Sequence, residues 1–146
     1  MVSPHQIPLA RELCKLVGEK NFLYAAMTDI DQGRLINGWQ ENYPDPWIVH
    51  PNKYKKDQES FNDFYKEAEV LICGQRLIKE MQEHVNNNKL CFYMSERWWK
   101  PRLGMLRLCS PVFLKMFFEY RRLSKSTKFH YLAIGPFAAS DMALVT

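Results

Sequence analysis

Several features that define common protein classes are missing from this 146-residue sequence. Its apolar runs, such as Val70–Cys73 and Met116–Phe118, are far shorter than the roughly 20 residues that cross a bilayer. The first residues, Met1–His5, hold no basic region followed by an apolar stretch, so no signal peptide is predicted. We therefore expect a cytoplasmic protein.

Motifs for metal, redox and nucleotide chemistry are also missing. The cysteines are scattered without a CxxC pair, which argues against zinc fingers and thioredoxin chemistry. The histidines lie far apart and never in an HExxH spacing. Neither GxGxxG nor GxxxxGK[ST] occurs, so we expect no nucleotide site in this chain, and no cofactor or metal.

Acidic residues are scarce in one part of the chain. Residues 95–128 hold nine Lys or Arg against only Glu96 and Glu119, although the net charge of the whole sequence is +4. This asymmetry points to an anionic partner or surface, while a solvated helix face is the plain alternative. Basic and aromatic residues alternate here, but no nucleic-acid motif is present, so nucleic acid is not an expected partner.

The residues that are present indicate a folded α/β protein. A hydrophobic content of 47% is too high for a disordered chain and fits one domain over residues 1–146. Apolar spacing predicts helices over Gln6–Val17, Asp57–Glu69, Arg76–Val85, Ser110–Leu123 and from Gly135 towards Val145. Asp57 is a candidate cap of the second helix, and His84 lies late in the third, which is expected to be a surface helix. Strands are predicted over Asn21–Met27, Trp47–His50, Val70–Cys73, Leu90–Met94 and Phe129–Ile134. Such alternation favours a mostly parallel sheet covered on both faces.

Ligands of parallel sheets bind beyond the carboxyl ends of the strands, which selects the segments that carry chemistry. Ser95, Glu96 and Arg97 directly follow a predicted strand. Glu96 could act as a base or stabilise positive charge, and its neighbours could hydrogen-bond sugar hydroxyls. The structural alternative is an ion pair at the strand end.

Three further segments meet the same criterion. The turn that holds His5 and Gln6 offers donors at a helix start, or else simply caps that helix. Gly74 follows a strand and lets the chain turn. The segment that begins at Gly135 has small residues that allow close approach of a ligand, with Ser140 and Asp141 as polar groups; tight packing of a helix is the alternative.

In this order the segments resemble the amino-terminal half of bacterial glycosyltransferases of the GT-B type, found in cell-surface polysaccharide clusters. The resemblance covers nearly the whole chain. It is carried by Ser3-Pro4-His5-Gln6, by Phe92-Tyr93-Met94-Ser95-Glu96-Arg97, and by Gly135-Pro136-Phe137-Ala138-Ala139-Ser140-Asp141. Met94 between Tyr93 and Ser95, and Pro4 in the first turn, depart from the family pattern.

The resemblance implies a Rossmann-like three-layer domain whose first strand is largely missing, since only Met1–Ser3 precede the first turn. It implies that this half binds a saccharide or lipid-linked acceptor, with Glu96 as the catalytic residue. His5, Gln6, Gly74, Ser95, Arg97, Ser140 and Asp141 are then the substrate-binding residues. A nucleotide-sugar donor binds only to an absent carboxyl-terminal domain, so hexosyl transfer by this fragment alone is not expected.

Lipid-linked acceptors imply contact with the inner face of the membrane. Basic residues in the segment around the predicted helix Ser110–Leu123, together with its aromatic residues, suit such a contact: Arg107, Lys115, Arg121 and Arg122. The alternative function is a non-catalytic domain that uses this basic segment to bind an anionic membrane surface or polymer.

Overall fold

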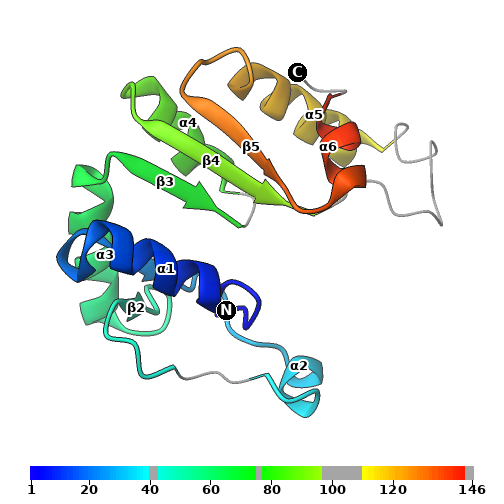
Figure 1. The fold of residues 1–146 in the computed structure, drawn as a ribbon. Coiled ribbons are helices and arrows are strands. Elements are labelled where there is room, and N and C mark those ends of the chain that lie inside the picture. The colour runs from blue at the N-terminus through cyan, green and yellow to red at the C-terminus, as the bar shows by residue number, and fades with distance from the viewer. Residues whose placement is uncertain (40–42, 75–76, 97–109, 144–146) are drawn as a thin grey trace. The chain divides into compact units, whose positions relative to one another are not determined.

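A computed structural model of the chain describes residues 1–39, 43–74, 77–96 and 110–143, and it confirms the α/β class (Figure 1). Helices alternate with strands along the chain, and every strand pair is parallel, as in Rossmann-like folds. The chain forms two compact units, Met1–Ala68 and Glu69–Thr146, and each is described by itself. A single domain over residues 1–146 stays a prediction.

The first unit is built around a small parallel pair of strands. Its elements are α1 (Ile7–Val17), the 3₁₀ turn η1 (Glu19–Asn21), β1 (Tyr24–Ala25), α2 (Gln32–Ile36), β2 (Ile48–Val49) and α3 (Lys55–Glu67). Tyr24 pairs with Ile48, and Ala25 pairs with Val49. Both predicted strands of this region therefore exist, although they are shorter than their apolar runs.

Helix α1 packs through one stripe of its surface. Ile7, Ala10 and Cys14 are buried at helical spacing, and the last two share a cluster with Trp47. On the exposed side, Arg11 donates two hydrogen bonds to Asp45, at 3.2 Å from Nε and 2.8 Å from a terminal nitrogen. This bidentate pair fixes α1 to the segment that precedes β2.

The start of α3 differs from the prediction. We expected Asp57 to cap a helix that begins there, but the helix begins at Lys55 after Tyr54. The Asp57 carboxylate instead accepts a hydrogen bond from the backbone N–H of His50, 2.7 Å away. The prediction of the cap was wrong because a tertiary contact, invisible in local sequence, takes the side chain.

The second unit is a three-stranded parallel sheet with crossover helices. Its elements are β3 (Val70–Cys73), α4 (Ile78–Asn86), β4 (Leu90–Ser95), α5 (Pro111–Leu123), β5 (Phe129–Ala133) and α6 (Pro136–Ala143). The strand order is β3-β4-β5, so β4 is central. Figure 1 shows α4 and α5 on the same side of this sheet.

The core of this unit lies between the sheet and these two helices. Met81 of α4, Cys91 and Tyr93 of β4, and Tyr120 of α5 belong to one buried cluster. The rings of Tyr93 and Tyr120 stack with their centres 4.7 Å apart. Helix α5 is thereby held to the central strand by a ring contact as well as by buried apolar area.

His84 of α4 belongs to the buried side of the second unit, although the sequence placed it on a surface helix. Its exposed fraction is only 2%. The reason is visible in the spacing, since His84 follows the buried Met81 by three residues and shares its face. Burial lowers the pKa of the imidazole, and a hydrogen bond to the backbone of Glu69 opposes this effect in part.

We expect His84 to make stability depend on pH. The folded state disfavours the charged imidazole, whereas the unfolded chain binds a proton near pH 6.5. The contribution of His84 to the free energy of unfolding should therefore be greatest above about pH 6.5 and should fall as the pH drops towards 5. Urea unfolding across this range measures the slope. The slope should shrink in His84→Gln and persist in His130→Gln, which changes an exposed histidine; equal slopes in all three proteins would contradict the assignment.

Candidate functional site

The carboxyl ends of three parallel strands meet at one edge of the second unit. Cys73 pairs with Tyr93, and Ser95 pairs with Ala133, so the strands leave the sheet at neighbouring positions. Gly74 follows β3, Glu96 follows β4, and Gly135 precedes α6 after β5. Three of the segments predicted to carry function thus lie along the same edge.

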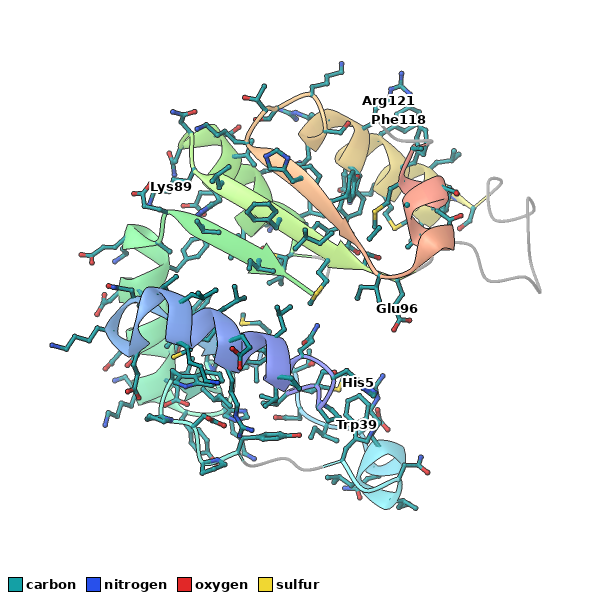
Figure 2. The ribbon with its side chains drawn as sticks, viewed as in Figure 1. His5, Trp39, Lys89, Glu96, Phe118 and Arg121 are labelled. Carbon is teal, nitrogen blue, oxygen red and sulfur yellow. The ribbon has the colours of Figure 1, made fainter. Side chains whose placement is uncertain are left out.

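Glu96 directly follows the central strand of this edge, as predicted, and is exposed (Figure 2). The backbone carbonyl of Ser95 accepts a hydrogen bond from the N–H of Ile134 at 2.9 Å, which holds the end of β4 against the end of β5. The hydroxyl of Ser95 donates to the carbonyl of Glu96 at 2.8 Å. Glu96 forms no ion pair with another described residue, and its neighbour Arg97 lies outside the described residues, so the alternative of a strand-end ion pair stays open.

The turn from β5 into α6 depends on Gly135. Its φ of +89° lies in the region that side-chain-bearing residues rarely adopt. The chain reverses there, and α6 begins at the next residue. Because Ile134 is bonded to Ser95, this helix start lies next to the end of β4, where its N–H groups carry partial positive charge.

Ser140 and Asp141, both predicted to bind substrate, lie on different sides of helix α6. Ala138, Asp141 and Met142 form its buried face, and Asp141 has an exposed fraction of 6%. Ser140 is exposed on the remaining surface of the helix. The ordinary helical repeat therefore turns Asp141 inward and leaves Ser140 as the side chain open to solvent.

Cys73, at the end of β3, is held as a neutral thiol. A hydrogen bond with Cys91 and then burial raise the pKa of Cys73 far above its usual value. Because the thiolate and not the thiol is the nucleophile, Cys73 suits packing and does not suit nucleophilic catalysis. This leaves Glu96, Ser95 and Ser140, together with backbone groups, as the candidate polar groups of this region.

The remaining predicted ligands, His5 and Gln6, belong to the first unit. The hydroxyl of Tyr24 donates to the side-chain oxygen of Gln6 at 2.7 Å, so Gln6 helps to hold β1 against the start of α1. His5 is exposed, and its ring meets that of Trp39 edge to face at 5.9 Å. His5 is therefore open to a ligand, while Gln6 already has a structural partner.

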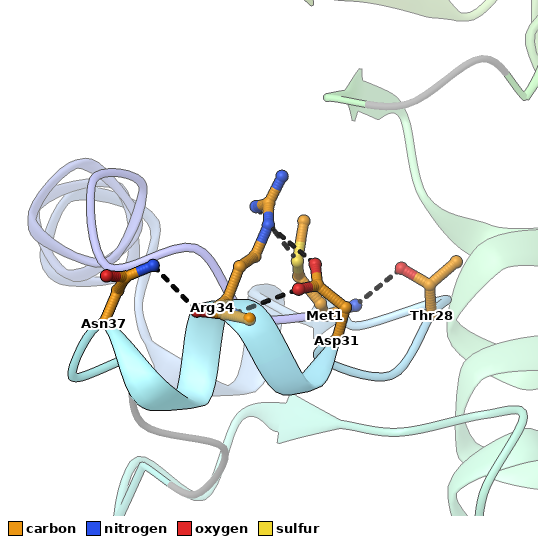
Figure 3. A network of polar contacts seen from close by, with 6 residues as sticks. Met1, Thr28, Asp31, Arg34 and Asn37 are labelled. Carbon is orange, nitrogen blue, oxygen red and sulfur yellow. Dashed lines mark hydrogen bonds and ion pairs between the residues drawn. The ribbon is translucent and has the colours of Figure 1, made fainter.

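Arg34 also contacts Trp39, and Figure 3 shows the network of polar contacts around Arg34. Asp31 caps α2 by accepting from the N–H of Arg34 at 3.0 Å, and its carboxylate also pairs with the Arg34 guanidinium at 3.0 Å. The guanidinium carbon lies 4.5 Å from the centre of the Trp39 ring. His5, Trp39 and Arg34 thus form a contiguous group of an imidazole, an indole and a guanidinium.

Sequence reasoning missed Arg34 and Trp39. Arg34 lies in the short helix α2 and Trp39 in the loop that follows it, and no periodicity of the sequence relates either residue to the start of α1. The Asp31–Arg34 spacing at a helix start was the one available signal, because an aspartate there caps the first turn.

Some of the basic residues predicted to contact a substrate or a membrane belong to the described ranges, and others do not. Arg97 and Arg107 lie outside the described residues. Lys115, Arg121 and Arg122 are exposed on α5, and Lys115 lies 3.9 Å from the carboxylate of Glu119. No helix in the described part of the chain is long and apolar enough to cross a bilayer.

In the described ranges, no group of three or more His, Cys, Asp or Glu side chains is placed to hold a metal ion. Comparison of the chain with protein-family models, curated proteins and solved structures finds no match, so an assignment of function depends on the residues and their geometry.

Proposed function

We propose that this chain is the acceptor-binding half of a two-domain glycosyltransferase, and that the nucleotide-sugar donor binds to a separate domain. The observation that carries the proposal is the position of Glu96 after the central strand of a parallel sheet, beside the start of α6. This is the edge at which ligands of such sheets bind.

Each group at this edge has a part in the proposed transfer. The Glu96 carboxylate accepts the proton of an acceptor hydroxyl as its oxygen attacks the anomeric carbon of the donor sugar. The bond from that carbon to the diphosphate breaks, and the nucleoside diphosphate leaves with the bonding electrons. Ser95 and Ser140 supply hydroxyls that hydrogen-bond the acceptor sugar.

The first unit offers a second set of groups that suit a saccharide. The Trp39 ring is only partly buried, and His5 and Arg34 add hydrogen-bond donors around it. Because Arg34 lies over one face of the Trp39 ring, the C–H groups of a sugar would pack on the part of the ring that stays exposed, with the sugar hydroxyls towards His5 and Arg34.

Calorimetry on the isolated chain tests whether this chain binds the acceptor saccharide and not the nucleotide-sugar donor. We expect short oligosaccharides to bind with an affinity that is nearly unchanged between 50 and 500 mM salt, because sugar hydroxyls carry no charge to screen. We expect no binding of nucleotide sugars below about millimolar concentration, since the sequence has no phosphate-cradling loop. Micromolar affinity for a nucleotide sugar would rule out the proposed roles of the two domains.

A matched pair of double variants locates the saccharide site. Ser95→Ala with Glu96→Gln should weaken oligosaccharide binding by about 10-fold or more, as expected for losing a charge-assisted hydrogen bond. Glu59→Gln with Ser60→Ala makes the same chemical change on the exposed surface of α3 and should have no effect. The alternative function, a non-catalytic binder of anionic surfaces, predicts no oligosaccharide binding in any of these proteins.

A further inference from the structure

The outer side of α5 combines exposed apolar and basic side chains in one stripe. We call this stripe the α5 face, and it consists of Leu114, Lys115, Phe118, Arg121 and Arg122. The exposed fractions are 63% for Phe118 and 40% for Leu114. Because each of the other four residues lies three or four positions from Phe118, they surround Phe118 on the helix surface.

The packing of the second unit does not account for these apolar side chains. The opposite side of α5 supplies the core contacts, through Phe113, Tyr120 and Leu123. Phe118 points away from that core, and Figure 2 shows it close to Arg121 on the outside of the helix. An amphipathic surface helix usually keeps its outer side polar, so exposed Phe118 and Leu114 indicate a partner for this face.

The charge around the α5 face is strongly one-sided. Residues 110–128 contain five cations and a single carboxylate, Glu119, which is held by Lys115. Arg121, Arg122 and Lys125 form no ion pair with any described residue. An anionic partner would therefore meet cations that are not already neutralised.

A cavity of about 300 Å³ adjoins the face, between the last turns of α4 and α5. Arg122 lines it and also belongs to the α5 face; Lys125, Ser126, Gln82 and Asn86 add further polar groups, and the apolar side chains of Val85 and Leu123 complete the lining. Both helices end here just before β4 and β5 begin, so the cavity lies at the amino edge of the sheet. It is therefore separate from the carboxyl edge that carries Glu96.

We propose that the α5 face is a docking surface for an anionic phospholipid bilayer, and that the cavity receives the phosphate of a lipid headgroup. Helix α5 lies along the membrane, with Phe118 and Leu114 at the boundary between headgroups and acyl chains. Arg121, Arg122 and Lys125 contact headgroup phosphates, and Arg122 joins the two parts of the surface. This contact goes beyond the proposed acceptor site and stands independently of it.

Co-sedimentation with vesicles that contain no saccharide tests the docking surface. The complete chain should pellet with phosphatidylcholine vesicles that carry about 30 mol% phosphatidylglycerol at low salt, and should stay in solution with pure phosphatidylcholine. Arg121→Gln with Arg122→Gln should weaken binding by about 30-fold at low salt, since two cations are lost near the surface. Lys125→Gln should weaken it by roughly 5-fold.

The controls separate a bilayer from other anionic partners. Lys20→Gln with Lys56→Gln removes the same charge from exposed positions in the first unit and should bind like the wild type. Phe118→Ser should weaken vesicle binding at least 5-fold without changing the circular dichroism spectrum, because its ring is exposed in the folded chain.

Three results would overturn the proposal. The first is equal binding to neutral and anionic vesicles, and the second is a control variant that binds anionic vesicles as weakly as the arginine variant. The third is unchanged vesicle binding by Phe118→Ser together with full competition by 10 mM inorganic phosphate or a single-stranded oligonucleotide. The last result would identify a site for soluble anions. Oligosaccharide binding at the carboxyl edge is measured separately, so failure of one proposal leaves the other standing.

Discussion

When the chain acts together with the donor-binding domain that the proposal requires, Glu96→Gln is expected to lower sugar transfer by roughly 10²-fold. The amide keeps the size of the side chain but cannot accept the proton of the acceptor hydroxyl. Because Glu96 is exposed and forms no ion pair with another described residue, the substitution should not alter folding. Initial rates at saturating acceptor measure the effect.

The matched control is Glu67→Gln, which changes an exposed carboxylate at the end of α3 and should leave the rate unchanged. A Glu96→Gln enzyme with more than half the wild-type rate would contradict the assigned role.

The second large effect concerns the core of the second unit. Tyr120→Ala should lower the free energy of unfolding by about 4 kcal/mol, because it leaves a cavity where a fully buried ring stacks on Tyr93. Urea denaturation followed by circular dichroism measures this change. Phe118→Ala, one half-turn away and largely exposed, should cost less than about 1 kcal/mol.

Equal losses from the two substitutions would mean that α5 does not pack as the structure places it. A fully unfolded Tyr120→Ala protein would be uninformative about magnitude, so Tyr120→Phe serves as a milder change. It keeps the ring stacked on Tyr93 and should cost under about 2 kcal/mol.

The parts of the fold that sequence predicted best are those fixed by local chemistry. Ser110 followed by Pro111 predicted the start of α5, and the helix begins at Pro111. The apolar run Leu90–Met94 predicted β4, which extends by only one residue to Ser95. Proline has a fixed φ, and a buried central strand needs a continuous apolar run, so these signals do not depend on distant residues.

Elements that depend on distant contacts were harder to predict. The apolar run Asn21–Met27 predicted seven residues of strand, whereas β1 has two, because strand length follows the partner β2 and not the run itself. The position of Trp39 beside His5 was also hard to predict, because the two residues lie far apart in the sequence and meet only in the folded first unit.

The position of several candidate residues at one edge of the sheet was predicted from the sequence. The rule that ligands bind at the carboxyl ends of parallel strands selected Gly74, Ser95 and Glu96, and the strand register places all three at one edge. The rule could not distinguish Ser140 from Asp141, because which side of α6 is buried depends on packing against β5. Whether His5 and Gln6 serve the same ligand as Glu96 stays a prediction.

The most direct test of the proposed function is a nuclear magnetic resonance titration of the labelled chain with an oligosaccharide that binds in calorimetry. The account predicts amide shifts at the carboxyl edge, at Gly74, Ser95, Glu96, Gly135 and Ser140, with no shifts along the α5 face. Shifts confined to α5, or an oligosaccharide that binds without perturbing Ser95 and Glu96, would contradict the assignment of this edge as the acceptor site.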